Sequence, residues 1–489
     1  MAISFLNIPP TIRAPGVYVE FDASHALQGL SLLAYRALGI GQRLTAGTVA
    51  ELVPTRVTSA EQAGGFFGVG SQLHRMAVAW FKNNTFTELW MCAQNDAGGG
   101  VKATQTLTVT GPATGAGTLA LLVNGEQVQV AIASGDAQNT IATAVGAAIN
   151  AKTSLPVTAT VSTNVVTATA RNTGTPGNDI DIRLNYYEGE KTPAGVAVAI
   201  AAGVAGSGDV DVSAVWTVLG ETFYNVMFFA VNDATNLGRI DTELVSRWGP
   251  MRMIEAVAHT GFRGTFSAAS TKGSAQNSKF TSMIAANSSP THPMEWAAAT
   301  AAQVAGSANI QPNRPFKSLP LFNVLPPKSK DNYSPTERNL LLFDGISTFV
   351  VDQAGNATLD RVISTYQISP LSAEDVTFLD IGTALTLGYL RYDWRTFWLT
   401  HYPRHLLAGD GNNFGPGLAI MTPKQGRGEA INRFRLWEER GLVDNAAQYK
   451  KDLVVERNAT DPNRLDFILP PNIVNGLMVT GVQIGFILE

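Results

Sequence analysis

The chain has 489 residues, of which 45% are hydrophobic and 15% are charged, and its formal net charge is −4. This length exceeds one ordinary domain and predicts about three. A weakly acidic chain lacks the basic face that nucleic-acid binding needs, so direct binding of nucleic acid is not expected. So low a share of charged residues is typical of a protein that buries much of its surface against copies of itself.

The single cysteine, Cys92, excludes an intrachain disulfide and any cysteine-based metal cluster. The N-terminal residues lack a basic region followed by an apolar core, so we expect no signal peptide. The most continuous apolar stretch, 194–205, is too short to span a membrane, so stable membrane insertion is not expected. These features predict a chain that is made in the cytoplasm and needs no cofactor.

The first part of the chain, residues 1–24, is predicted to be an extended arm. Pro9, Pro10 and Pro15 exclude a helix there. The stretch 16–22 then alternates between apolar and polar residues, which predicts a half-buried strand. Because prolines isolate this strand, we expect a sheet from elsewhere to complete it. The arm residues on which this expectation rests are Gly16, Val17, Tyr18, Val19, Glu20 and Phe21.

Residues 25–97 indicate a small α/β part. The stretches 32–40 and 88–93 are strand-like, and two helices are expected between them. Ser59 followed by Gln62 predicts a capping box, and Ser71 can cap the second helix. In that second helix, a stripe of apolar residues recurs at helical spacing.

Residues 98–206 predict a separate strand-rich domain inserted into a larger one. Asn124-Gly125 between two apolar runs predicts a hairpin, because this pair accepts the positive φ angles of a type I′ turn. The stretch 136–151 has helical periodicity, and 157–161 with 165–170 predict two more strands.

Residues 207–365 alternate strand and helix, which predicts a doubly wound α/β domain. Strands are expected at 224–231, 253–259 and 280–286, helices at 237–248 and 293–305, and a turn with further strands at 340–351. The continuous apolar run at 224–231 is typical of a central parallel strand.

Residues 366–476 form a further domain, with helices expected at 378–398 and 427–440 and a strand at 465–469. The last segment, 477–489, is predicted to be an extended strand that acts as a C-terminal arm. Its key residues are Val479, Val482, Ile484, Phe486 and Leu488. The fold class is thus mixed α/β, with several domains and extended terminal strands.

Catalytic and metal-binding patterns in the sequence are incomplete. His259 and Ser267 suggest a serine protease, but they lie close together in one expected loop, whereas a triad draws on separated strand ends. His401 and His405 have the spacing of a zinc helix, yet Pro403 lies between them and the glutamate of that motif is missing.

Three further patterns favour ordinary structure. Asp209 and Asp211 lack the remaining ligands of a calcium loop, so a solvated turn is expected. The glycine-rich run 65–70 does not match a phosphate-binding loop and is expected to be a turn. The aromatic residues of 389–402 can form a carbohydrate platform, but at helical spacing they are expected to pack in a core. No enzyme is therefore predicted.

The two terminal strands carry the functional prediction. An unpaired strand exposes a row of N–H and C=O groups, which invites strand addition from another chain. One such junction is weak, whereas many closed together in a ring or helix hold firmly. The residues alone leave open the alternative that both strands fold back on their own subunit.

Both ends of the chain resemble one known family. The run 14–20, Ala-Pro-Gly-Val-Tyr-Val-Glu, is similar to the opening of contractile phage tail sheath proteins, and the run 461–476 resembles the closing segment of Mu-type sheaths. The order of parts between them also resembles this family: arm, α/β piece, inserted domain, doubly wound domain, C-terminal domain and terminal strand.

This resemblance implies a subtilisin-like central domain without the protease triad. It also implies subunits that stack as rings in a helix around a tail tube, joined by terminal arms, and that contract to drive the tube through the host envelope. The implied partners are copies of the chain, the tail tube protein, and baseplate and tail terminator proteins. The implied location is the phage tail, and we expect the inserted domain on the sheath exterior. The alternatives are another virion shell or adhesion protein, or a phage-borne hydrolase.

Overall fold

The computed structural model describes residues 13–19, 29–411, 414–415 and 418–487. The chain folds into two units. The smaller unit joins residues 1–33 with 386–489, and the larger unit comprises residues 34–385. The two termini of the chain therefore belong to the same unit, although the sequence separates them by the whole of the larger one.

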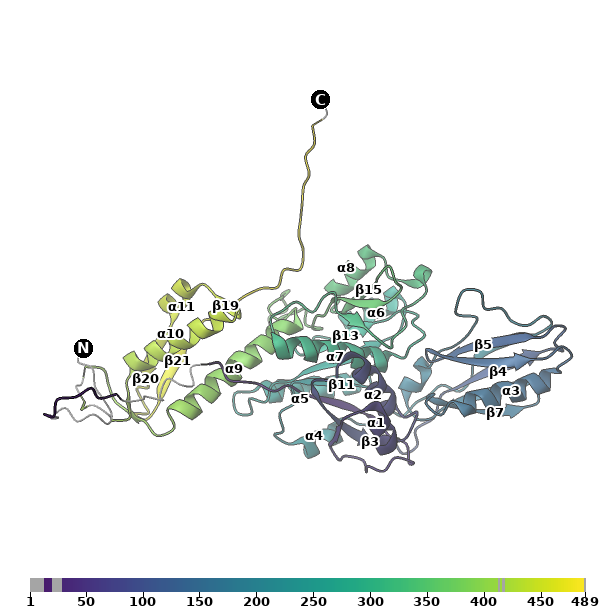
Figure 1. The fold of residues 1–489 in the computed structure, drawn as a ribbon, viewed down its shortest axis with the longest axis horizontal. Coiled ribbons are helices and arrows are strands. Elements are labelled where there is room, and N and C mark those ends of the chain that lie inside the picture. Colours follow the sequence, from purple (N-terminus) through teal and green to yellow (C-terminus); the bar gives the residue numbers. More distant parts are fainter. Residues whose placement is uncertain (1–12, 20–28, 412–413, 416–417, 488–489) are drawn as a thin grey trace. The chain divides into compact units, whose positions relative to one another are not determined.

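A six-stranded sheet forms the centre of the larger unit, in the order β13-β12-β11-β1-β3-β2 (Figure 1). Its neighbouring strands run parallel except for β2, which pairs antiparallel with β3. The strands are β1 (Arg36–Gln42), β2 (Thr55–Val57), β3 (Glu88–Gln94), β11 (Val226–Phe229), β12 (Val257–Phe262) and β13 (Thr281–Ala285).

Helices cover both faces of this sheet. Successive residues of a strand point to opposite faces. Phe228 of β11 stacks on Trp80 of α2 with ring centroids 5.2 Å apart, and Phe229 contacts Trp216 of α4 at 6.1 Å. The predicted α/β class is confirmed. The helices of the larger unit outside the inserted segment are α1 (Ala60–Phe67), α2 (Gln72–Asn83), α4 (Ser213–Leu219), α5 (Ala234–Trp248), α6 (Phe266–Ser274), α7 (Pro293–Ile310) and α8 (Pro335–Phe343).

The segment between β3 and α4 forms two further sheets, ordered β10-β4-β8-β7 and β6-β5-β9, around a core of their own. We refer to residues 98–206 as the strand-rich module. Its elements are β4 (Thr104–Thr110), β5 (Gly117–Val123), β6 (Glu126–Ile132), α3 (Gln138–Ala151), β7 (Val157–Ser162), β8 (Val165–Ala170), η1 (Thr175–Asp179), β9 (Ile182–Leu184) and β10 (Ala197–Ala202).

A small sheet in the order β14-β16-β15 follows α7. It comprises β14 (Pro320–Leu321), β15 (Thr348–Val351) and β16 (Ala357–Arg361), with η2 (Ser329–Asp331) after β14. Helix α9 (Ile381–His401) begins in the larger unit and continues into the smaller one.

The smaller unit contains helices and three two-stranded sheets, β17-β18, β19-β22 and β20-β21. Besides most of α9, its elements are β17 (Leu406–Leu407), β18 (Ile420–Met421), α10 (Pro423–Glu439), β19 (Val443–Asp444), α11 (Ala446–Asp452), β20 (Val454–Arg457), β21 (Leu465–Ile468) and β22 (Asn472–Ile473).

Local sequence signals explain where several elements begin. The hydroxyls of Ser59 and Ser71 cap α1 and α2 as expected, each accepting a backbone N–H. The capping box differs in one respect, because the Gln62 side chain accepts from Thr58 N instead of Ser59 N. The turn between β5 and β6 has φ 50° at Asn124 and 79° at Gly125, which confirms the expected hairpin.

Two expectations for the doubly wound part were wrong. Residues 340–343 belong to α8 and not to a turn or strand, because Ser334 and Glu337 form a reciprocal capping box. The strand expected from residue 253 begins at Val257, because Met253 takes a left-handed φ of 53° and Ile254 N donates to Arg247 O, which closes the turn after α5.

Candidate functional site: the terminal arms and their anchor

The N-terminal arm forms no strand in its described part, residues 13–19. Val17 is 93% exposed and Val19 is 75% exposed, so the prediction of a half-buried strand does not hold for the single chain. The physical reason is that a lone strand leaves its backbone groups to water until another strand pairs with it. Gly16 and Tyr18 also lie in this described part, whereas Glu20 and Phe21 lie outside the described residues.

The C-terminal arm is similar. Residues 474–487 belong to no helix or strand and run as an extended segment (Figure 1). Five of its apolar side chains are at least three-quarters exposed: Val479, Val482, Ile484, Phe486 and Ile487. Leu488 lies outside the described residues. An extended apolar segment with so little cover is typical of a surface that another chain completes.

A buried ion pair holds the root of the N-terminal arm. Arg433 of α10 donates Nε to Asp393 Oδ2 of α9 at 2.6 Å, and its second contact is to Asp393 Oδ1. Ser31 N donates to Asp393 Oδ1 at 2.7 Å, and Arg433 Nη1 donates to Gly29 O at 3.1 Å. Trp437 Nε1 donates to the same carboxylate at 2.7 Å. The carboxylate of Asp393 is thus saturated by charged and neutral donors, and it fixes residues 29–31 to the helices of the smaller unit.

The C-terminal arm starts from the same unit. Strand β22 pairs antiparallel with β19, and Val474 N donates to Leu442 O at 3.1 Å immediately after it. Both arms are therefore anchored on one unit at residues 29–31 and 472–474. The sequence could not predict this shared root, because Asp393 and Ser31 lie 362 positions apart.

The hairpin β20-β21 in this unit has no third strand among the described residues. Asn458 N donates to Arg464 O at 2.9 Å, so these two residues form a hydrogen-bonded pair. Because hydrogen-bonded and non-hydrogen-bonded pairs alternate along antiparallel strands, this bond sets the direction of every other backbone group in the hairpin. The N–H and C=O groups of Val455 and Arg457 therefore point outward from the free edge of β20. Those of Leu465 and Phe467 point outward from the free edge of β21. The hairpin thus offers two edges for strand addition.

Aromatic packing holds this hairpin in place. The ring of Phe467 lies 5.2 Å from Trp394 and 5.1 Å from Trp398, both on α9. Gly426 of α10 allows the close approach, because a Cβ there would lie 3.1 Å from Leu465 and 3.2 Å from Phe467. The aromatic residues of α9 therefore contribute to packing. The sequence analysis had favoured this role over a carbohydrate platform.

The candidate catalytic residues do not converge. His259 lies within β12, 1% exposed, and neither ring nitrogen has a partner. Burial lowers the pKa of His259 to about 3, so the ring is neutral. Ser267 lies in α6, not in a shared loop, and the expectation that His259 ends its strand was also wrong because β12 continues to Phe262.

The candidate metal ligands have ordinary partners. His401 packs on Phe397 with ring centroids 4.7 Å apart. Asp209 Oδ1 accepts from Thr175 N at 2.6 Å, and Asp211 Oδ1 accepts from Ser213 N at 2.8 Å. Within the described part of the chain, no group of three or more His, Cys, Asp or Glu side chains could hold a metal ion. The described helices also include none long and apolar enough to cross a bilayer.

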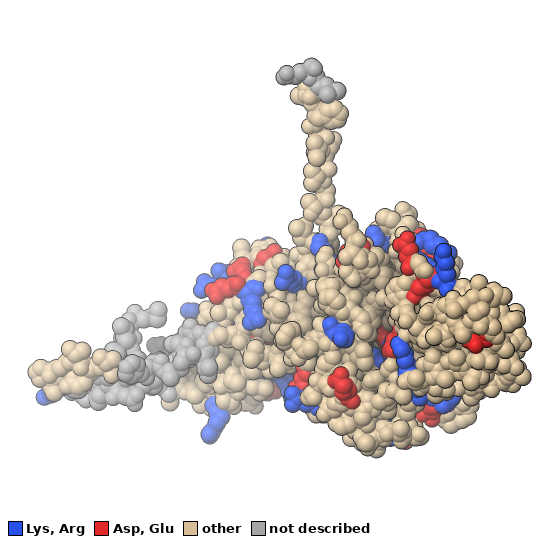
Figure 2. Space-filling view, turned by 45° about the vertical axis from the view of Figure 1, so that its right-hand side comes forward, with Lys and Arg blue, Asp and Glu red and all other residues tan. Residues whose placement is uncertain are grey.

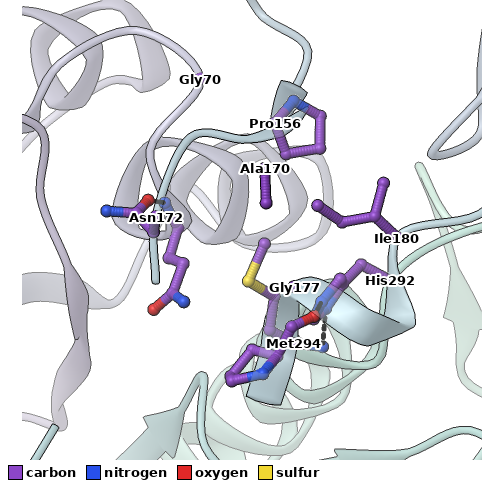
Figure 3. Close-up of a pocket in the computed structure, with 10 residues that line it drawn as sticks. Gly70, Pro156, Ala170, Asn172, Gly177, Ile180, His292 and Met294 are labelled. Atoms are coloured by element: carbon purple, nitrogen blue, oxygen red, sulfur yellow. Dashed lines mark hydrogen bonds between the residues drawn. The ribbon is translucent and has the colours of Figure 1, made fainter. Parts of the chain in front are cut away.

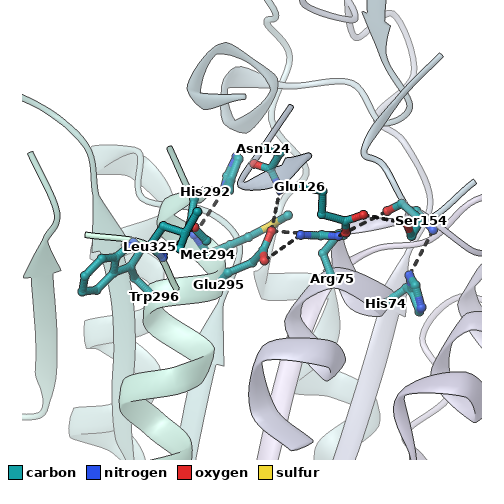
Figure 4. Close-up of polar contacts among 12 residues, drawn as sticks. His74, Arg75, Asn124, Glu126, Ser154, His292, Met294, Glu295, Trp296 and Leu325 are labelled. Carbon is teal, nitrogen blue, oxygen red and sulfur yellow. Dashed lines mark hydrogen bonds and ion pairs between the residues drawn. The ribbon is translucent and has the colours of Figure 1, made fainter. Parts of the chain in front are cut away.

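A buried polar network joins the strand-rich module to the core (Figure 4). Arg75 of α2 donates Nε to Glu295 Oε1 of α7 at 3.0 Å and Nη2 to Glu295 Oε2 at 2.9 Å. Arg75 also pairs with Glu126 of β6, and Asn124 Nδ2 donates to Glu295 Oε1 at 2.6 Å. Burial raises the pKa of Glu295 although Arg75 opposes this shift. The network joins β6 of the module to α2 and α7 of the core.

The cavities of the larger unit also differ from an enzyme site. The cavity in Figure 3 has a volume of about 20 Å³, enough for roughly one water molecule, and His292 Nε2 lies 2.7 Å from Pro176 O beside it. A wider groove of about 510 Å³ lies beside α8, where Tyr366 donates to Asp375 at 2.7 Å. Its lining is mainly apolar.

Comparisons with known proteins agree with this geometry. The family model for the phage tail sheath protein central domain matches residues 205–365, and that for the phage tail sheath C-terminal domain matches residues 373–485. The chain belongs to the phage tail sheath family, whose members are structural proteins and not enzymes. It is 36% identical over 488 residues to the Mu-like prophage FluMu tail sheath protein of Haemophilus influenzae, and the match covers all of both chains.

Solved structures of sheath proteins are also similar. A sheath tail protein from Desulfitobacterium hafniense is 12% identical, with 94% of this chain and 100% of that chain covered and a TM-score of 0.49. A sheath tail protein from Listeria innocua is 10% identical, with 92% and 94% covered and a TM-score of 0.48.

Proposed function

We propose that this chain polymerises as a helical stack of rings around a phage tail tube, and that the sheath contracts to drive the tube through the host envelope. The observation that carries the proposal is the pair of exposed arms rooted on one unit. Each arm leaves that unit at a fixed point, set by Asp393 for one arm and by the β19-β22 pair for the other.

We infer that the arms of neighbouring copies add to the edges of β20-β21. The hairpin has two edges and each copy has two arms, so every edge can be filled in a closed lattice. If an arm forms about six hydrogen bonds at roughly 1 kcal/mol net each, one junction contributes near 6 kcal/mol before ordering costs. Such a junction is weak in isolation, so free subunits stay dispersed, whereas many junctions closed together hold firmly.

Contraction requires that subunits move without separating. In the proposed mechanism, the arms act as flexible tethers while each unit moves as a rigid body. The strand-rich module then lies on the sheath exterior, and the central domain has a subtilisin-like fold without a triad. Proposed partners besides copies of the chain are the tail tube, baseplate and tail terminator proteins, and the chain is made in the host cytoplasm before assembly.

The proposed parts of the chain keep the boundaries expected from the sequence: the arm 1–24, the α/β part 25–97, the module 98–206, the doubly wound domain 207–365, the C-terminal domain 366–476 and the arm strand 477–489. These boundaries define the variants for an assembly test.

Negative-stain electron microscopy tests the proposal. Full-length protein is compared with a variant that lacks residues 477–489. We expect hollow tubes or striated sheaths from the full chain and dispersed subunits from the truncated one. Closed shells from the full chain would favour another virion protein, and dispersed subunits from both would contradict polymerisation through the C-terminal arm.

A further inference from the structure

The strand-rich module contains one sheet with two unlike edges. In the order β10-β4-β8-β7, the outer strands are β10 and β7. Gly203 N donates to Thr104 O at 2.9 Å, and this bond shows which residues of β10 form hydrogen-bonded pairs with β4, since such pairs alternate along the strands. The N–H and C=O groups of Val198, Ile200 and Ala202 therefore point away from β4. None of these six groups has a partner among the described residues.

The centre of the opposite edge is occupied by a side chain. Asn150 of α3 accepts from Ala159 N through Oδ1 at 2.8 Å and donates Nδ2 to Ala159 O at 2.8 Å. Its amide thereby takes the place of a neighbouring strand at the centre of β7. A sheet that is occupied at the centre of one edge and open along the other favours strand addition at β10.

The composition of β10 favours such an addition. Residues 194–207 include no charged residue and no proline, the two features that usually prevent edge pairing. Val198 and Ile200 pack on the module core, and the exposed face carries only alanines, which leave room for another strand. In Figure 2 the module, the lobe at the right, shows few charged side chains on its visible face.

Several other edges in the described chain carry charged groups. Lys152 Nζ donates to Gln127 O on the edge strand β6, and β2 carries Arg56, which pairs with Glu88. The edges of β20-β21 carry Arg457 and Asp466. The uncharged edge of β10 therefore contrasts with these three edges.

We propose that β10 pairs antiparallel with β10 of a second copy of this chain while the subunits are free. The strand is its own complement: with Ile200 opposite Ile200, Val198 lies opposite Ala202 and all six backbone groups of each copy are used. A twofold contact of this kind closes on itself and yields a dimer, not a fibre. Six residues bury less than the roughly 1,600 Å² of a standard stable interface, so the dimer is weak and depends on concentration.

The pairing has a consequence for assembly that rests on the proposed function. Subunits of a sheath all point the same way along its axis, so no twofold relates neighbours within it. The β10 dimer must therefore open before both copies join one sheath. It covers an aggregation-prone edge in free subunits and limits the supply of assembly-ready monomer.

Disulfide trapping in the full chain tests the pairing. In the proposed register, residue 199 lies opposite residue 201 of the second copy. The variant Ala199→Cys/Ala201→Cys should therefore give a covalent dimer under mild oxidation, which reductant removes. The native cysteine does not interfere, because Cys92 is buried and burial raises the pKa of its thiol to about 12. The matched control is Thr158→Cys/Thr160→Cys, two positions that are also exposed, on the strand whose edge Asn150 occupies.

We expect at least tenfold more covalent dimer from the β10 variant than from the β7 control. A second measurement uses Ala199→Lys/Ala201→Lys, which brings like charges together and should weaken dimerisation at least tenfold in sedimentation velocity, with the melting temperature unchanged. Equal crosslinking of both cysteine variants, or none from β10, would overturn the proposal. Sheath formation is scored separately by microscopy, so failure of the dimer and failure of the sheath role remain distinguishable.

Discussion

Ser31 N donates a 2.7 Å hydrogen bond to Asp393 Oδ1, and this bond ties the root of the N-terminal arm to α9. The same carboxylate pairs with Arg433, which is 4% exposed. The bond links two segments at opposite ends of the sequence. It means that a force on the N-terminal arm reaches the unit from which the C-terminal arm also starts.

The first prediction concerns this anchor. Asp393→Ala leaves Arg433 buried without its counter-charge, and we expect it to lower the free energy of unfolding of the smaller unit by about 3–5 kcal/mol. Urea unfolding, followed by the fluorescence of the tryptophans on α9 and α10, measures this change. The control Glu439→Ala alters an exposed carboxylate on α10 and should change stability by less than about 0.5 kcal/mol. Equal effects of the two substitutions would show that Asp393 is not an anchor.

The second prediction concerns the network between the strand-rich module and the core. Arg75→Met leaves Glu295 buried and unpaired, and we expect a loss of about 3–5 kcal/mol. Adding Glu295→Gln should restore much of that loss, because the buried charge is then gone. A double-mutant cycle in urea measures the coupling. The exposed pair of Arg36 and Glu88 provides the control, since Arg36→Ala should cost less than about 1 kcal/mol. Additive effects of the two core substitutions would contradict the network.

The third prediction is a pH dependence. The pKa of His259 falls from 6.5 to about 3 in the folded chain, so only the unfolded chain takes up this proton between those values. The contribution of His259 to stability is therefore complete above pH 6.5 and declines as the pH falls towards 3. At pH 5 the loss is roughly 2 kcal/mol.

His259→Leu should remove that part of the loss. We expect a melting temperature close to that of the native chain at pH 7 and higher than it at pH 5. Burial also lowers the pKa values of His74 and His292, each to about 4, so part of the pH dependence remains. The control Thr143→Leu, at an exposed position of α3 that has no titratable group, should leave the pH dependence unchanged. A pH dependence that is the same with and without His259 would contradict the argument.

The fourth prediction concerns the C-terminal arm. Ile484→Lys places a charge on the apolar face of the arm, and we expect at least tenfold less polymer in sedimentation assays. Its melting temperature should not change, because Ile484 is 83% exposed in the single chain. Gln483→Lys adds the same charge on the opposite face and should retain most of the polymer. If both variants polymerise equally well, the apolar face of the arm makes no contact between subunits.

Local structure could be predicted from the sequence wherever neighbouring residues set it. Ser59 and Ser71 cap helices within their own turn, and Asn124-Gly125 fixes a hairpin through its backbone angles alone. The apolar run at 224–231 predicted a central strand because a strand buried on both faces has no polar side. The sequence also showed that the catalytic patterns are incomplete, because the required residue types are missing at the required spacing.

Contacts between residues far apart in the sequence could be seen only in the folded chain. No local pattern indicates that Asp393 binds Ser31, that Arg75 joins Glu295 and Glu126, or that Asn150 bonds the outer edge of β7. Whether the arms are strands is likewise not a local property. Val17 and Ile484 lie in sequences that favour a strand, but a strand exists only when a second one supplies its hydrogen bonds.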